Sequence, residues 1–158
     1  MDTDLHSNYM REAIRLANNN IKNGGGPFGA IIVQDNEIIG RGVNRVTANS
    51  DPTAHAEVNA IREAALHLKT FDLSNCSIYT SCEPCPMCLG AIYWARISTI
   101  YYGNAKKDAA QIGFDDQFIY DEIKKPLAAR KIPTQQLLKL EAISTFSSWA
   151  ASDDKIEY

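Results

Sequence analysis

The pattern of apolar and polar positions predicts an α/β protein. Apolar residues recur at helical spacing in some segments, and short apolar runs bounded by turn residues mark others as strands. These segments are helices over 9–21, 53–67 and 86–96, and strands over 28–33, 38–43, 77–81 and 97–102. The first two strands are separated by four turn residues and form a hairpin. The last two are separated by a helix, which predicts a right-handed β-α-β unit with a parallel pair.

Beyond the last of these strands the periodicity is weaker. We expect weak helices at 104–111 and 121–129, a loop at 113–120, a fifth strand at 134–140 and a short helix at 144–151. The order of elements predicts one domain over 1–158, a three-layer α/β/α fold with a mixed five-stranded sheet. The polar stretch 152–158 is expected to be a C-terminal tail.

Composition narrows the range of partners and cellular locations that the protein can have. The chain has 158 residues, 45% of them hydrophobic, and a formal net charge of −3, which argues against nucleic acid as a partner. Apolar runs fall short of the roughly 20 residues that a membrane span needs, so no membrane partner is expected. The acidic, polar start MDTDLHSNYMREA does not resemble a signal peptide, so we expect a cytoplasmic protein with reduced cysteines.

Two short motifs carry candidate metal chemistry. His55 and Glu57 stand near the start of one predicted helix, and Cys85 and Cys88 flank the start of another, with Pro86 between them. Cysteines three apart in a first turn face one side, and the positive helix end favours their thiolate forms. One imidazole and two thiolates make a three-ligand zinc site that leaves a fourth position for water or hydroxide. Glu57 is then the candidate proton shuttle.

Two observations complicate this interpretation. Residues two apart on a regular helix point to nearly opposite sides. His55 and Glu57 therefore converge only if the axis of this helix points at the metal, so that its first turn faces the site. The spacing of Cys82, Cys85 and Cys88, with Cys76 upstream, also fits an iron–sulfur site, although that site would leave His55 and Glu57 unexplained.

The combined pattern H-x-E…P-C-x-x-C is typical of zinc nucleobase deaminases. The chain resembles the cytidine/deoxycytidylate deaminase superfamily and, within it, the bacterial guanine deaminases. The similarity rests on the segments 44–57, 81–96 and GFDDQFIY at 113–120, and on the C-terminal pair Glu157-Tyr158. It implies one zinc per subunit, hydrolysis of the small purine guanine to xanthine and ammonia, and a homodimer that exchanges its C-terminal segment to cover the partner's pocket.

The resemblance also implies roles for single residues. Asp116 corresponds to a second catalytic acid that contacts the guanine amine, although sequence alone also fits a solvated turn at Asp115-Asp116. Asn44 offers both a donor and an acceptor to a purine edge. The other expected substrate contacts are the backbone near Ala56 and the aromatic walls Phe28, Phe114 and Tyr158. Phe28 and Trp94 are alternatively core residues.

Other functions fit the same motifs. A tRNA adenosine deaminase shares both motifs, although a more basic surface would be expected of it. Deaminases of cytosine, guanosine or another small base also fit. A zinc-stabilised nucleotide-binding domain without activity is the non-enzymatic alternative, but a structural site more often has four protein ligands.

Overall fold

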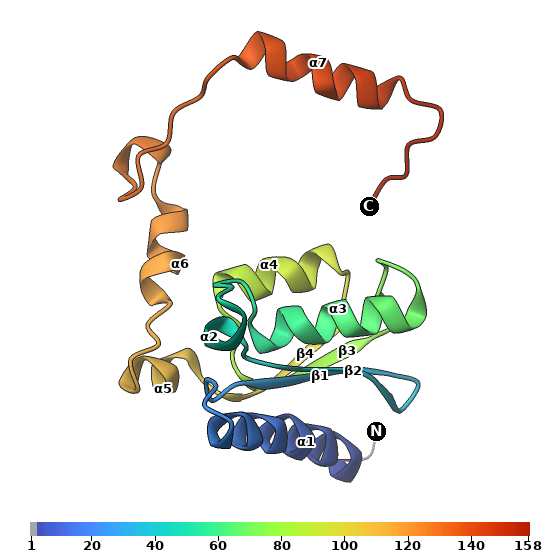
Figure 1. Ribbon diagram of the computed structural model, residues 1–158, viewed down its shortest axis with the longest axis vertical. Coiled ribbons are helices and arrows are strands. Elements are labelled where there is room, and N and C mark those ends of the chain that lie inside the picture. Colours follow the sequence, from blue (N-terminus) through green and yellow to red (C-terminus); the bar gives the residue numbers. More distant parts are fainter. Residues whose placement is uncertain (1–2) are drawn as a thin grey trace. The chain divides into compact units, whose positions relative to one another are not determined.

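The computed structural model describes residues 3–158 and divides into two compact units, Met1–Gln117 and Phe118–Tyr158. The larger unit holds the whole β-sheet and most of the helices (Figure 1). The elements are α1 (Thr3–Lys22), β1 (Gly29–Gln34), β2 (Glu37–Val43), α2 (Val46–Asn49), α3 (Ala56–Leu68), β3 (Ser77–Cys82), α4 (Pro86–Trp94), β4 (Thr99–Asn104), α5 (Lys106–Gln111), α6 (Gln117–Lys124), η1 (Leu127–Ala129) and α7 (Lys139–Ala150).

The sheet has four strands in the order β2-β1-β3-β4. The hairpin β1–β2 is antiparallel, and its turn residues Asp35 and Asn36 both have positive φ, as a two-residue hairpin turn requires. β1 also pairs antiparallel with β3. The strands β3 and β4, which α4 connects along the chain, are parallel. The predicted hairpin and β-α-β unit are therefore confirmed.

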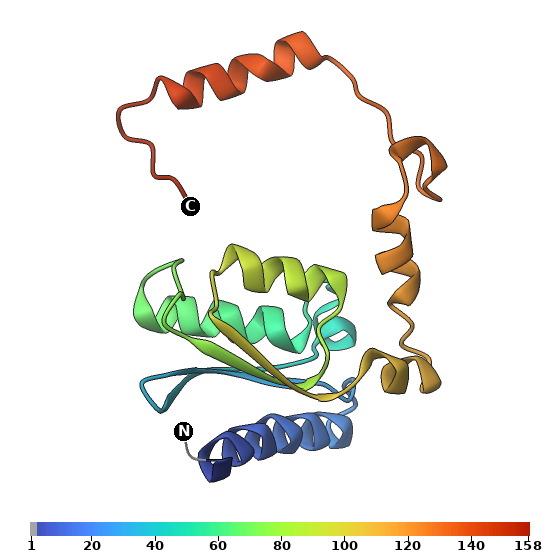
Figure 2. The ribbon, with the colours of Figure 1, turned by 180° about the vertical axis from the view of Figure 1, so that it is seen from behind.

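Helices cover both faces of this sheet, which makes the larger unit three-layered (Figure 2). On one face, Tyr9 and Ala13 of α1 pack against Ile31, Val33 and Tyr79. On the other face, the alanines of α3 pack with Ile92 of α4 over the side chains of Ile32 and Ile78. Ile31 and Ile32 thus enter different cores, because successive side chains of a strand point to opposite faces.

The start of α3 lies unusually close to β2, and Gly42 makes this approach possible. A Cβ atom at Gly42 would lie 2.0 Å from the carbonyl oxygen of Ala56, so only glycine fits. The backbone of β2 therefore sets the position of the first turn of α3, which carries Glu57. This contact connects the fold directly to the candidate site.

The predicted fifth strand at 134–140 is wrong. Residues 134–138 form no regular element, Leu138 has a left-handed backbone (φ 49°), and α7 begins at Lys139. A strand needs a neighbour to pair with its backbone, and all strands of the described chain lie in the larger unit. The single domain expected over 1–158 stays a prediction.

Several helix boundaries also differ from the predicted ones. α1 begins at Thr3 and includes Ser7 and Asn8, because Leu5 adds an earlier turn that packs with Tyr9 against the sheet. α3 begins only at Ala56, after His55, whose backbone is extended. Among the helices of residues 3–158, none combines the length and apolar character needed to cross a membrane.

Candidate metal centre and active site

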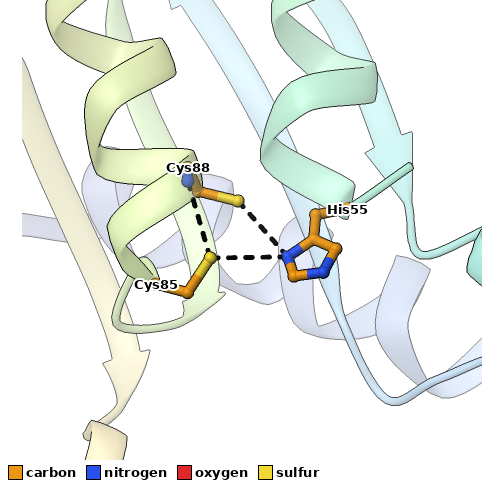
Figure 3. A group of neighbouring side chains, drawn as sticks. All are labelled: His55, Cys85 and Cys88. Carbon is orange, nitrogen blue, oxygen red and sulfur yellow. Dashed lines mark hydrogen bonds between the residues drawn. The ribbon is translucent and has the colours of Figure 1, made fainter. Parts of the chain in front are cut away.

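The three predicted metal ligands meet at the starts of two helices. His55 is the N-cap residue of α3, Cys85 is the N-cap residue of α4, and Cys88 lies in the first turn of α4. The Nδ1 atom of His55 is 3.5 Å from the Sγ atom of each cysteine (Figure 3). Their ligand atoms all lie within 4.8 Å of one another.

This spacing fits a tetrahedral zinc ion. Zinc binds thiolate sulfur at about 2.3 Å and histidine nitrogen at about 2.0–2.1 Å, which places the two ligand atoms about 3.6 Å apart at a tetrahedral angle. The observed 3.5 Å distances agree with this value. Cys76 and Cys82 are buried and lie outside the metal-binding group found in residues 3–158, so the structure does not support the iron–sulfur alternative.

The charges at the centre also favour a divalent cation. A hydrogen bond from Cys88, and the nearby His55, lower the pKa of Cys85 to about 4. The hydrogen bond to Cys85, burial and the neighbouring Glu57 raise the pKa of Cys88. The two thiols therefore oppose each other's ionisation, and a divalent metal would offset the charge of both thiolates.

Glu57 lies directly beside this group. Its Oε2 atom is 3.4 Å from Cys88 Sγ, and the residue is only 6% exposed. Burial raises the pKa of its carboxyl group, which brings it closer to the range useful for a proton shuttle. His55 and Glu57 converge because His55 is an extended cap residue outside the helix, whereas Glu57 belongs to its first turn.

Thr80 is a site residue that the sequence did not reveal. Its buried hydroxyl lies 3.2 Å from Glu57 Oε1 and 3.0 Å from the carbonyl oxygen of Cys82, and its single proton serves both acceptors. On β3 it occupies the same face as Ile78, where apolar residues are expected. A polar residue on the buried face of a strand was the available signal.

Asp116 is close enough to the candidate ligands for their charges to act on one another. Its charge influences the pKa of His55, and burial, followed by the charge of Cys85, raises the pKa of Asp116 itself. Asp115 instead accepts a hydrogen bond from the backbone N–H of Gln117, at 3.0 Å, and caps the start of α6. The two neighbouring acids thus have different surroundings: Asp115 bonds to the backbone, whereas Asp116 interacts electrostatically with the candidate ligands.

The structure brings some of the residues predicted to contact the substrate close to one another. Phe28 and Phe114 form an edge-to-face pair with ring centroids 4.9 Å apart. Asn44 follows β2 and donates its backbone N–H to the carbonyl of Phe28, and Ala56 is fully buried at the start of α3. Tyr158 belongs to the smaller unit, so its role stays a prediction. Trp94 is 69% exposed at the end of α4, and the core position considered for it is wrong.

A three-ligand His/Cys/Cys group with an adjacent buried carboxylate, on a helix-flanked mixed sheet, defines the class of zinc-dependent hydrolytic deaminases. Residues 3–104 match the family described as the cytidine and deoxycytidylate deaminase zinc-binding region. The chain belongs to this family.

Individual relatives cover almost the whole chain. A guanine deaminase from Bacillus subtilis is 51% identical over 97% of this chain and 99% of its own length. A crystal structure of guanine deaminase from Bacillus subtilis aligns with a TM-score of 0.94 and 50% identity, covering 100% of this chain and 99% of that one. A tRNA-specific adenosine deaminase from Buchnera aphidicola is 36% identical over 98% of this chain and 93% of its own length.

Proposed function

We propose that this protein catalyses the hydrolytic deamination of guanine to xanthine and ammonia. The observation that carries this proposal is the buried carboxylate of Glu57 beside the ligand group of His55, Cys85 and Cys88. The choice of guanine is supported by the similarity to guanine deaminase over nearly the full length of both chains. The identity to tRNA adenosine deaminase is lower, and the net charge of −3 gives little attraction for RNA.

In this mechanism His55, Cys85 and Cys88 hold the zinc ion. Bound zinc supplies Lewis-acid chemistry, which makes water nucleophilic near neutral pH. Glu57 carries the first proton of the attacking water to a ring nitrogen, and it then carries the second proton, from the new C2 hydroxyl, to the leaving amine. A C2–O bond forms and the C2–N bond to the exocyclic amine breaks, so guanine and water give xanthine and ammonia.

The remaining residues orient the purine. Asp116 accepts a hydrogen bond from the exocyclic amine, because a carboxylate is a strong acceptor for an NH₂ group. Asn44 pairs with the purine edge, the backbone near Ala56 contacts the base, and Phe28 and Phe114 flank its ring. Cys85 and Cys88 must stay reduced to act as ligands, which is consistent with a cytoplasmic location.

The test is ammonia release by the zinc-loaded protein from guanine, guanosine, adenine, cytosine and an anticodon stem-loop RNA. We expect release from guanine far above that from the other substrates. Release from the RNA alone would identify a tRNA deaminase. No release from any substrate, with full zinc content, would support the non-catalytic alternative.

We also propose that the protein is a homodimer whose C-terminal segments exchange. Every residue in 131–158 is exposed, yet α7 carries large apolar residues at every third position: Leu140, Ile143, Phe146 and Trp149. Residues three apart advance by about 300° around a helix, so these side chains spread over about half of its circumference. Exposed apolar surface of this extent needs another surface to cover it. A second copy of the chain is the proposed cover, with Tyr158 closing the partner's pocket.

A further inference from the structure

Asn20 is a buried asparagine near the C-terminal end of α1. It follows Asn18 and Asn19, which are both exposed, whereas Asn20 is only 8% exposed. A buried side-chain amide destabilises the fold unless its donors and acceptors are paired. The partners of Asn20 therefore indicate why an amide is present at this position.

The side chain of Asn20 holds two other segments through both of its N–H groups. Nδ2 donates to the carbonyl oxygen of Gly26 at 2.8 Å and to the carbonyl oxygen of Asn44 at 2.8 Å. Its backbone carbonyl accepts a hydrogen bond from the backbone N–H of Gly25, also at 2.8 Å. One residue thus joins the end of α1, the glycine loop 24–26 and the segment that follows β2.

Both carbonyl groups lie next to the backbone of Phe28 or Asn44, the residues that are expected to contact the purine. The Gly26 carbonyl also accepts the backbone N–H of Phe28 at 2.9 Å, and the Asn44 N–H donates to the Phe28 carbonyl at 3.2 Å. The Oδ1 atom of Asn44 accepts the backbone N–H of Val46 at 3.2 Å, so Nδ2 of Asn44 is the group left to donate to a ligand. The orientation of Asn44 is therefore fixed by its backbone and by one side-chain bond.

The glycine loop leaves room for this arrangement. A Cβ atom at Gly25 would lie 2.3 Å from Nδ2 of Asn20, so any larger residue displaces the amide. The glycine run is thus more than a helix stop. It lets a buried amide reach two carbonyl groups at once.

We propose that Asn20 is a positioning residue that holds Asn44 and Phe28 in place for binding of the purine; this inference rests on the proposed function. The amide is the suitable group because it supplies two N–H donors from one short side chain. Aspartate has the same shape but places a charged acceptor against two carbonyl oxygens. Alanine leaves both carbonyl groups without their donor.

The test compares Asn20→Ala with Asn18→Ala, an exposed asparagine on the same helix. For Asn20→Ala we expect kcat/KM for guanine to fall by roughly ten- to hundredfold, mostly through KM, since small displacements of a binding group weaken substrate orientation. Zinc content should remain complete, and Asn18→Ala should behave as the unsubstituted protein. Asn20→Ser keeps one donor and should give an intermediate loss, so it serves as the test if the alanine variant does not fold.

A double-mutant cycle separates positioning from general destabilisation. If Asn20 acts largely through Asn44, Asn20→Ala should reduce kcat/KM clearly less in an Asn44→Ala background than in the unsubstituted protein, because the two effects are not independent. Additive losses, or an Asn20→Ser variant equal to Asn18→Ala, would overturn this inference while guanine turnover persists. An unsubstituted protein that releases no ammonia from guanine would instead overturn the proposed function.

Discussion

At the scale of single residues, the site depends on a carboxylate that is kept out of water. Glu57 is buried between the Cys88 thiol and the Thr80 hydroxyl, and burial raises the pKa of its carboxyl group. A proton shuttle works best when its pKa lies near the working pH. The structure therefore gives Glu57 the environment of a catalytic acid and base, whereas the ligand atoms come from other residues.

Replacing Glu57 by glutamine should separate catalysis from metal binding. Glutamine has a similar shape but cannot take up the proton, so we expect turnover to fall by roughly 10²–10⁴-fold. Zinc content, measured by elemental analysis, should stay at one per chain, because the ligand group of residues 3–158 does not include Glu57. Glu63→Gln, an exposed position on the same helix, is the matched control. Turnover that survives Glu57→Gln would refute the shuttle.

Thr80 should act through Glu57. In Thr80→Val the hydroxyl bonded to Glu57 is lost while the shape of the side chain is kept, so we expect kcat to fall by about tenfold or more with zinc retained. Thr80→Ser restores the hydroxyl and should recover most of the rate. If valine and serine reduce kcat equally, the hydroxyl does not position Glu57.

At the scale of elements, the features that were predicted correctly are those that depend on residues close together in the sequence. The hairpin and the β-α-β unit follow from strand runs and turn residues, and the ligands follow from two helix starts. The apolar residues Leu137, Leu138 and Leu140 resembled a strand because a short apolar run does not reveal whether a partner strand exists. Asn20 and Thr80 were missed because their roles depend on contacts between segments distant in sequence.

The packing of α1 on the sheet predicts a loss of stability at high pH. Tyr79 is 2% exposed, stacks on Tyr101 with centroids 4.6 Å apart, lies near Tyr9, and pairs its hydroxyl with Nδ1 of His6. Burial, followed by the neighbouring tyrosines, raises the pKa of Tyr79 to about 12, compared with about 10 in an unfolded chain. The folded protein holds this proton more tightly, so its stabilising effect is complete below about pH 10 and is lost as the pH rises toward about 12.

This dependence is measurable by denaturant unfolding at a series of alkaline pH values. Tyr79→Phe removes the ionisable group and should reduce the decline in unfolding free energy between about pH 10 and 12. Tyr93→Phe, at a tyrosine that is 76% exposed, should leave the decline unchanged. Equal curves for Tyr79→Phe and the unsubstituted protein would show that another group controls alkaline unfolding.

At the scale of the whole molecule, the two compact units differ in how they bury apolar residues. The larger unit has a core on each face of its sheet, whereas residues 131–158 are all exposed. A segment with the apolar side chains of α7 and Tyr158 needs a covering surface that it does not contain. The proposed exchange between two copies supplies that surface and gives the last residue a function.

Removal of residues 156–158 should reduce guanine turnover by about tenfold or more, because an open pocket admits water and orients the purine poorly. Zinc content should stay intact, and Asp153→Ala should serve as the matched tail control. The exchange itself is tested by mixing two impaired proteins, the truncated chain and full-length Glu57→Gln, under conditions that allow subunits to recombine. A mixed dimer has one intact centre covered by the other chain's tail, so activity should rise above the sum of the two separate proteins. If both proteins are dimeric and mixing restores no activity, the tail does not act on the partner's pocket. Unchanged turnover after truncation would show that Tyr158 does not close the site.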